Sequence, residues 1–196
     1  MNKETSLAKD LFLLASTMTY PLEHRDINIA ISVLIEAIKI FPKEPAYYYY
    51  LGLATYMKGD VEEAIKLYQG TIDLDTQRRL EKEEKRSTVS VDGNEDSDND
   101  QIEGIELPLP DVWPALGTAM QALERNNEAI DCYIRANIDN MEDMQKAIFL
   151  AHYGMALCSK DIKKFEEGRE MTGQAMRLLE SHTEVIEAYN YCKHAT

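Results

Sequence analysis

The side chains best suited to catalysis or metal binding are scattered along the chain. They are four histidines and three cysteines, namely His24, His152, His182, His194, Cys132, Cys158 and Cys192. A zinc site needs several such ligands at short, fixed spacings, and the chain offers a single close pair, Cys192 and His194, with no further ligand nearby. We therefore expect no metal site. The odd, widely spaced cysteines are interpreted as small buried residues in a reducing compartment.

The sequence carries no motif of a known catalytic class. It has no glycine-rich phosphate loop, no serine elbow and no metalloprotease signature, so we expect no enzyme and no cofactor. Carboxylates are abundant because the chain is acidic, with 35 Asp and Glu against 21 Lys and Arg and a formal net charge of −14. This charge repels phosphate, which argues against nucleic acid as a partner. The same field attracts a basic peptide or protein.

Acidic residues concentrate between Asp92 and Glu106, where seven of them, with no basic residue, supply half of the net charge. The spacing lacks the central glycine and the closing glutamate of a calcium-binding loop, so a calcium site is not expected. Too little apolar surface is present to offset the entropy of ordering, and residues 87–106 are therefore predicted to be a mobile loop. Ser97, which precedes acidic residues, is a candidate phosphorylation site. The loop is either a solubilising insertion or a docking segment for a basic partner.

The elements that hold these side chains are indicated by two stretches that align on each other. Tyr48, Leu51-Gly52, Ala64, Tyr68 and Thr71 in the first correspond to Trp113, Leu116-Gly117, Ala129, Tyr133 and Ala136 in the second. Bulky and small residues at such fixed offsets are typical of a helix–turn–helix unit, where the small residues allow two helices to cross closely. The spacing from Ala30 to Ala64 is 34 residues, so a further unit precedes the first stretch.

This pattern resembles the tetratricopeptide repeat, whose period is about 34 residues. The resemblance implies an all-α fold, a right-handed α-solenoid of about four helix–turn–helix units and a C-terminal closing helix. We predict one domain over residues 1–196, with repeats at about 8–42, 45–78, 110–143 and 147–180 and a closing helix at 183–193. The second helix of the second repeat is expected to continue to Arg86 as a solvated extension. The predicted repeat core comprises Leu51, Gly52, Ala64, Tyr68, Trp113, Leu116, Gly117, Ala129, Tyr133 and Ala136.

Stacked repeats of this kind present a concave surface to a partner. The alignment places one stripe on that surface in the second repeat, namely Tyr49, Leu53, Tyr56 and Met57. The matching stripe of the third repeat is Pro114, Thr118, Gln121 and Ala122. Two interpretations of Tyr49 and Tyr56 remain open: packing against a neighbouring repeat, or a half-exposed aromatic floor for a peptide.

The resemblance also indicates a ligand that we do not expect. Some repeats of this family bind the acidic tail of heat-shock chaperones through asparagines and cations on the inner stripe. Here Leu53 and Thr118 stand where that clamp needs asparagine, and Asp111 and Ala115 stand where it needs cations. The chain is therefore unlike a chaperone-tail clamp.

The predicted function is a non-catalytic adaptor or scaffold that binds an apolar or basic segment of another protein in this groove. The alternative is a dedicated chaperone that shields a basic or aggregation-prone client. No apolar run approaches the ~18–20 residues of a membrane span, so no membrane association is expected. The expected location is the cytoplasm, with the nucleus as the second compartment.

Overall fold

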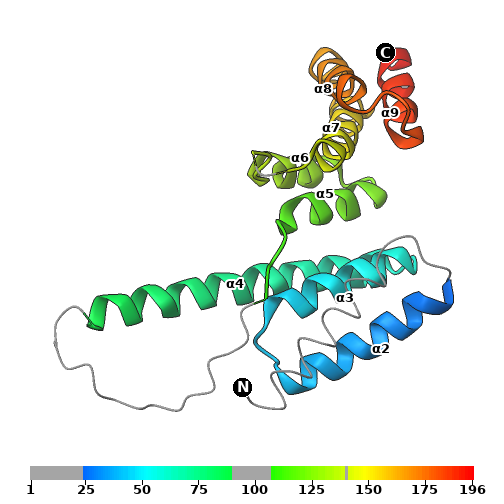
Figure 1. The fold of residues 1–196 in the computed structure, drawn as a ribbon. Helices are drawn as coiled ribbons and strands as arrows, with labels where there is room; N and C mark the ends of the chain where they lie inside the picture. The colour runs from blue at the N-terminus through cyan, green and yellow to red at the C-terminus, as the bar shows by residue number, and fades with distance from the viewer. Residues whose placement is uncertain (1–23, 90–106, 140) are drawn as a thin grey trace. The chain divides into compact units, whose positions relative to one another are not determined.

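The structure is a computed structural model that describes residues 24–89, 107–139 and 141–196. These residues form α-helices and no β-strand (Figure 1). The helices are α2 (His24–Ile40), α3 (Pro45–Met57), α4 (Val61–Val89), α5 (Val112–Ala122), α6 (Asn126–Arg135), α7 (Asp143–Leu157), α8 (Phe165–Leu178) and α9 (Thr183–His194). The predicted all-α class is confirmed. The first helix predicted for the first repeat and the candidate phosphorylation site Ser97 lie outside the described residues.

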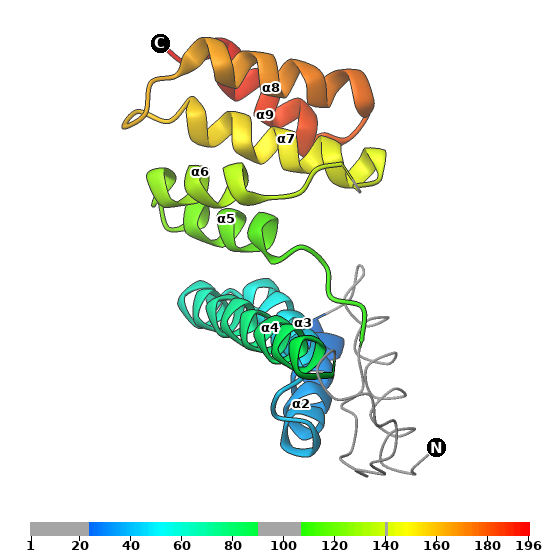
Figure 2. The same ribbon diagram turned by 90° about the vertical axis from the view of Figure 1, so that its left-hand side faces the viewer.

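The chain divides into two compact units, residues 1–110 and residues 111–196. In the first unit α3 packs against both α2 and α4. In the second unit α5 pairs with α6, α7 pairs with α8, and α9 packs against α7 and α8 (Figure 2). That residues 1–196 form one continuous domain stays a prediction.

Two of the helix pairs cross at a glycine that faces a buried tyrosine. A methyl group on Gly52 of α3 would lie 2.7 Å from Cε1 of Tyr68 in α4. A methyl group on Gly117 of α5 would lie 2.6 Å from Cε1 of Tyr133 in α6. Each ring therefore fills the space that the missing side chain leaves. Because both tyrosines are almost fully buried, this contact fixes the distance between the two helices of each pair.

The α7–α8 pair crosses more closely because a threonine takes the place of the tyrosine. A methyl group on Gly154 would lie 2.6 Å from Cγ2 of Thr172 and 2.8 Å from the carbonyl oxygen of Gly168. Backbone thus faces backbone at this crossing. Thr172 is fully buried, and its hydroxyl donates to the Gly168 carbonyl at 3.1 Å. The turn between α7 and α8, residues 158–164, is four residues longer than the turn between α3 and α4, residues 58–60, and than the turn between α5 and α6, residues 123–125.

The α5–α6 pair ends earlier than the repeat period suggests. At Ala136 the backbone changes from a helical to an extended conformation, with φ −67° and ψ 139°, so α6 ends at Arg135. Asp111 holds the chain there: one carboxylate oxygen accepts from the Asn137 amide at 2.6 Å, and the other caps α5 by accepting from the Trp113 amide at 3.1 Å. Helix α7 then begins at Asp143, before the predicted start of the fourth repeat near residue 147.

The long helix α4 has two halves. Its first half packs against α3, and its second half is exposed, with Leu80 60% accessible. The halves meet at Arg78, whose guanidinium pairs with Asp75 at 2.8 Å and with Glu44 at 3.5 Å. The predicted extension through Arg86 is present, since α4 continues to Val89.

A buried leucine that the sequence pattern does not predict lies in the first unit, shortly before the second unit begins. Leu107, which follows the acidic segment, is 6% exposed and is buried in a cluster with Leu34, Tyr47 and Leu51. Leu109 packs against the same cluster. The chain therefore contributes to the core of the first unit again after the acidic segment. None of the described helices is both long enough and apolar enough to cross a membrane.

Candidate partner-binding faces

The four consecutive tyrosines at the start of α3 have different surroundings. Glu44 caps this helix by accepting a hydrogen bond from the Ala46 amide at 3.3 Å. Tyr47 is fully buried, and burial, with the nearby Glu44 carboxylate adding to it, raises the pKa of its hydroxyl to about 12. Tyr48 is half-buried and donates from its hydroxyl to the Pro42 carbonyl at 2.9 Å. Both residues therefore fasten α3 to the first unit.

The stripe predicted to face a partner in the first unit is neither fully buried nor fully exposed. Its members Tyr49, Leu53, Tyr56 and Met57 are all half-buried. The Tyr49 ring lies 6.0 Å from the ring of the buried Tyr68. Burial raises the pKa of the Tyr68 hydroxyl far above its usual range, and the neighbouring Tyr49 and Tyr56 act in the same direction. The half-exposed Tyr49 thus lies against a buried tyrosine. We refer to Tyr49, Leu53, Tyr56 and Met57 as the aromatic face.

The corresponding stripe in the second unit is polar. Thr118 donates from its hydroxyl to the Pro114 carbonyl at 3.0 Å, and the same hydroxyl lies 3.4 Å from the Tyr133 hydroxyl. The Tyr133 hydroxyl in turn donates to Oε1 of Gln121 at 3.2 Å. Ala122 is exposed. The predicted residues Thr118 and Gln121 therefore form a hydrogen-bonded link between α5 and α6.

Gln121 extends this link to α7 and α9. Its Nε2 donates to the His152 carbonyl at 3.2 Å, and its Oε1 lies 3.2 Å from His152 Nδ1. The other ring nitrogen, Nε2, lies 2.7 Å from Oε1 of Glu184. We refer to Gln121, His152 and Glu184 as the polar row. The hydrogen bond from His152 lowers the pKa of Glu184, so this half-buried carboxylate stays ionised.

The sequence pattern places Gln121 on the inner stripe, but it assigns no partner-binding role to His152 or Glu184. A signal was nevertheless present in the spacing. His152 follows Gln121 by 31 residues, and Glu184 follows His152 by 32 residues. A separation close to one repeat period places residues on successive first helices of the repeats.

The predicted repeat-core residues are buried with two exceptions. Those with little exposure are Leu51, Gly52, Ala64, Tyr68, Leu116, Gly117, Ala129 and Tyr133. Trp113 is half-buried, and the Arg135 guanidinium lies over its ring at 4.9 Å from the centroid. Ala136 is half-buried because it lies just beyond the end of α6.

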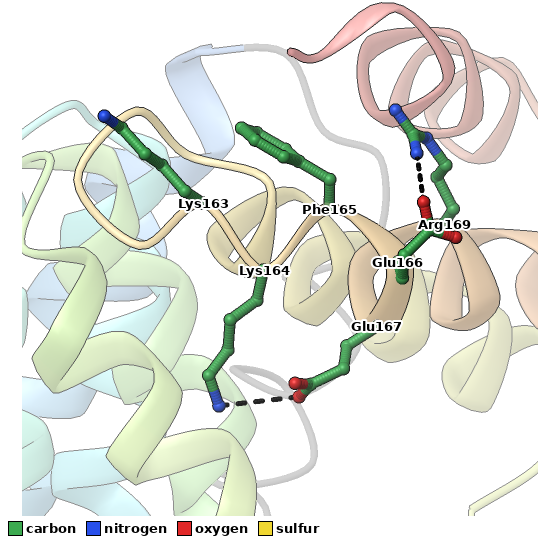
Figure 3. A pocket seen from close by; sticks show the side chains of 6 residues that line it. All are labelled: Lys163, Lys164, Phe165, Glu166, Glu167 and Arg169. Carbon is green, nitrogen blue, oxygen red and sulfur yellow. Dashed lines mark hydrogen bonds and ion pairs between the residues drawn. The ribbon is translucent and has the colours of Figure 1, made fainter.

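A surface depression of about 380 Å³ lies at the start of α8. It is lined by Lys163, Lys164, Phe165, Glu166, Glu167 and Arg169 (Figure 3). Its charges pair along the helix instead of converging on one point, since Arg169 contacts Glu166 at 2.7 Å and Lys164 contacts Glu167 at 3.5 Å (Figure 3). Within the described part of the chain, no three His, Cys, Asp or Glu side chains are grouped so that they could hold a metal ion.

Comparison with known proteins establishes the fold. No protein-family model and no curated protein matches the sequence. Among solved structures, the chain is similar to YrrB, a TPR protein with an unusual peptide-binding site, with a TM-score of 0.58 and 15% identity over 95% of this chain and 74% of YrrB. It is also similar to MamA, with a TM-score of 0.54 and 19% identity over 88% of this chain and 73% of MamA. The chain therefore has the all-α helical-repeat fold of the tetratricopeptide-repeat proteins, as the spacing of its Leu-Gly pairs indicates.

Proposed function

We propose that the chain is a non-catalytic adaptor that holds a segment of a partner protein on the first helices of its repeats. The observation that carries this proposal is the aromatic face. Tyr49 and Tyr56 are half-exposed on α3, and the Tyr49 ring lies 6.0 Å from the ring of the buried Tyr68. A supported tyrosine offers a partner a large contact area at a small loss of side-chain entropy, together with one hydrogen-bonding hydroxyl.

The composition of the aromatic face suggests the chemistry of the segment. Leu53 and Met57 provide apolar area beside the two tyrosines, and the described residues place no cation on this stripe. The net charge of −14 favours the approach of a basic partner. We propose an apolar segment with basic flanking residues as the ligand. The peptide-binding site of YrrB, a protein with the same fold, agrees with this use of the fold.

The second unit supports the proposal in a different way. Its polar row carries an ionised carboxylate, Glu184, whose side chain is 42% exposed. A lysine or arginine of the partner can pair with this carboxylate. The hydroxyl of Thr118 is already donated to the Pro114 carbonyl. The acidic tail of a heat-shock chaperone is therefore not part of the proposal, since the stripe offers it no cation.

The test is affinity purification of the tagged chain from its native cell in two forms, wild type and Tyr49→Ala combined with Tyr56→Ala. Tyr191→Ala is the matched control, because Tyr191 is an exposed tyrosine on α9 of the second unit and is not part of the aromatic face. We expect a stoichiometric partner that wild type and control retain and the double variant loses. Equal retention by all three forms would assign the tyrosines to the core and reject the aromatic face.

Salt distinguishes the adaptor from a chaperone that shields a basic client. At a few hundred millimolar salt the Debye length falls below ~6 Å, so a client held by net charge alone is released. A segment anchored on the two tyrosines is expected to remain bound. A basic partner that leaves in high salt and is absent from the mature assembly would favour the chaperone.

A further inference from the structure

The polar row offers a partner one charged group, the Glu184 carboxylate. This carboxylate is the outer end of the row, since the exposed fraction of the side chain is 16% for His152 and 42% for Glu184. Glu184 lies in the first turn of α9, where the positive end of the helix dipole favours a carboxylate. The hydrogen bond from His152 also lowers the pKa of Glu184, so the group is ionised at neutral pH.

His152 occupies one of the two carboxylate oxygens. An ionised carboxylate only accepts hydrogen bonds, so Nε2 of His152 carries a proton and donates to Oε1 of Glu184 at 2.7 Å. In the described part of the chain, this is the one hydrogen bond that Glu184 makes. A ligand therefore finds Oε2 as the oxygen that is still free.

Gln121 holds the imidazole in this position from the other side. Its Nε2 donates to the His152 carbonyl at 3.2 Å, and its Oε1 lies 3.2 Å from His152 Nδ1. Because a carbonyl oxygen only accepts, the amide nitrogen of Gln121 must face it, and this fixes which end of the amide lies beside the ring. The Tyr133 hydroxyl donates to the same Oε1 at 3.2 Å. Side chains of α5 and α6 thus fix the ring that contacts Glu184.

Another glutamate of the second unit shows what a guanidinium requires. Arg125 contacts both carboxylate oxygens of Glu128, with Nε donating to Oε1 at 2.7 Å and Nη2 donating to Oε2 at 2.5 Å. Two such parallel hydrogen bonds give arginine its advantage over lysine at a carboxylate. At Glu184 one of the two oxygens already accepts from His152. A lysine ammonium is a compact, strongly hydrated charge, so it needs one oxygen and suits a partly solvated site.

We infer that the polar row is a lysine-selective site, at which Oε2 of Glu184 binds one lysine ammonium of the partner. His152 is the positioning residue, because it occupies the oxygen that an arginine would need for its second hydrogen bond. The inference rests on the proposed function, since it names the basic residue that the bound segment presents to the second unit.

The experiment selects random peptides displayed on phage against the purified full chain at neutral pH and sequences the enriched pool. We expect wild type to enrich peptides that carry a lysine beside an apolar run. Synthetic copies of one enriched peptide, with lysine, arginine or acetyl-lysine at that position, give the Kd values by calorimetric titration. Lysine is expected to bind about two- to fivefold more tightly than arginine or acetyl-lysine, the size of effect expected of one exposed ion pair.

Three variants assign the preference to the polar row. Glu184→Gln is expected to bind the three synthetic peptides equally. His152→Leu leaves both oxygens of Glu184 free and is expected to shift the Kd ratio from lysine towards arginine, which the loss of a merely structural side chain would not do. Glu187→Gln is the matched control, because Glu187 is an exposed carboxylate on α9 outside the polar row, and it is expected to keep the wild-type ratio.

Two outcomes would overturn the inference and leave the proposed function intact: equal binding of the lysine and arginine peptides by wild type, or a lysine preference that Glu184→Gln retains. If wild type enriched no peptide at all, the proposed function would fail, and the lysine site would fail with it. The wild-type ratio is measured on the unaltered chain, so the test does not depend on whether His152→Leu folds.

Discussion

The two units share one repeat pattern, but they differ in the residues where helices cross and in the residues of the inner stripe. In the first unit the crossing glycine, Gly52, faces a tyrosine ring, and the stripe beside it is aromatic. In the second unit one crossing, at Gly154, brings backbone against backbone, and the polar row connects three helices. The repeat pattern therefore specifies where helices cross and where their surfaces lie, whereas the residues at the remaining positions decide which chemistry each face offers.

The largest expected effect distinguishes the two kinds of crossing. Gly154→Ala places a methyl group 2.8 Å from the Gly168 carbonyl oxygen, and the backbone of α8 cannot move aside. Gly52→Ala meets the ring of Tyr68 at 2.7 Å, and a side chain has more freedom to shift. We expect a loss of unfolding free energy of about 3 kcal/mol or more for Gly154→Ala and about 1–2 kcal/mol for Gly52→Ala, measured by urea denaturation.

Gly70 is the matched control for both substitutions. It lies within α4, and a methyl group there would contact nothing within 4 Å. Gly70→Ala is expected to stabilise the protein by about 0.5–1 kcal/mol, because alanine has the higher helix propensity. If Gly154→Ala were as mild as this control, the close crossing of α7 and α8 would be refuted.

The second prediction tests the aromatic face by comparing binding with folding. The combined change Tyr49→Ala and Tyr56→Ala is expected to weaken partner binding by about 2 kcal/mol or more, roughly 30-fold in Kd. The loss of unfolding free energy should be smaller, since both side chains are already half-exposed. Calorimetric titration of the purified partner and urea denaturation give the two numbers, and the reverse ranking would make the tyrosines core residues.

Much of this fold was accessible from the sequence because the repeat pattern is a local signal. The Leu-Gly pairs, the alanines and the second aromatic residue each occupy a fixed offset within a unit, so Gly52 and Tyr68 could be paired without a structure. The residues at which the helices end were harder to predict from the sequence. Helix α6 ends at Arg135 because Asp111 accepts a hydrogen bond from the amide of Asn137, which follows it by 26 residues, and a hydrogen bond between distant residues leaves no local signal in the sequence.

The chemistry of the candidate partner-binding faces also depends on contacts between residues that are distant in the sequence. The alignment identified Tyr49 and Gln121 as residues of an inner stripe, but it could not tell that Gln121 is hydrogen-bonded to a residue of another helix. His152 joins Gln121 to Glu184 only once three helices are stacked. Likewise, the burial of Leu107 depends on the first unit and not on the acidic residues that precede it.

The third prediction concerns the contact between His152 and Glu184 in the polar row, and its effect is expected to be modest. The hydrogen bond from His152 lowers the pKa of Glu184 below its ordinary value of 4.5. A lowered pKa in the folded state contributes stability above the unfolded value, and this stability is lost as the pH falls through the folded value. The unfolding free energy of wild type should therefore exceed that of Glu184→Gln above pH 4.5, and the difference should disappear at lower pH.

The expected difference is at most about 1 kcal/mol, because the Glu184 side chain is 42% exposed and solvent screens the pair. Urea denaturation at several pH values measures it. Glu187→Gln is the control on the same helix, since Glu187 is exposed and is not part of the polar row. A pH-independent difference between wild type and Glu184→Gln would show that the carboxylate does not act through its charge.

The smallest effect is expected from shortening the acidic segment. Deleting residues 90–99 removes four of its acidic residues and leaves both α4 and Leu107 in place. The stability of the first unit depends on the apolar cluster that includes Leu34, Tyr47 and Leu107, so the melting temperature should hardly change. Leu107→Ala, in contrast, removes a buried side chain and is expected to cost about 2–3 kcal/mol. If the deletion destabilised the protein as much as Leu107→Ala does, the acidic segment itself would have to contribute to the core, and the first unit would depend on residues that its sequence pattern assigns to solvent.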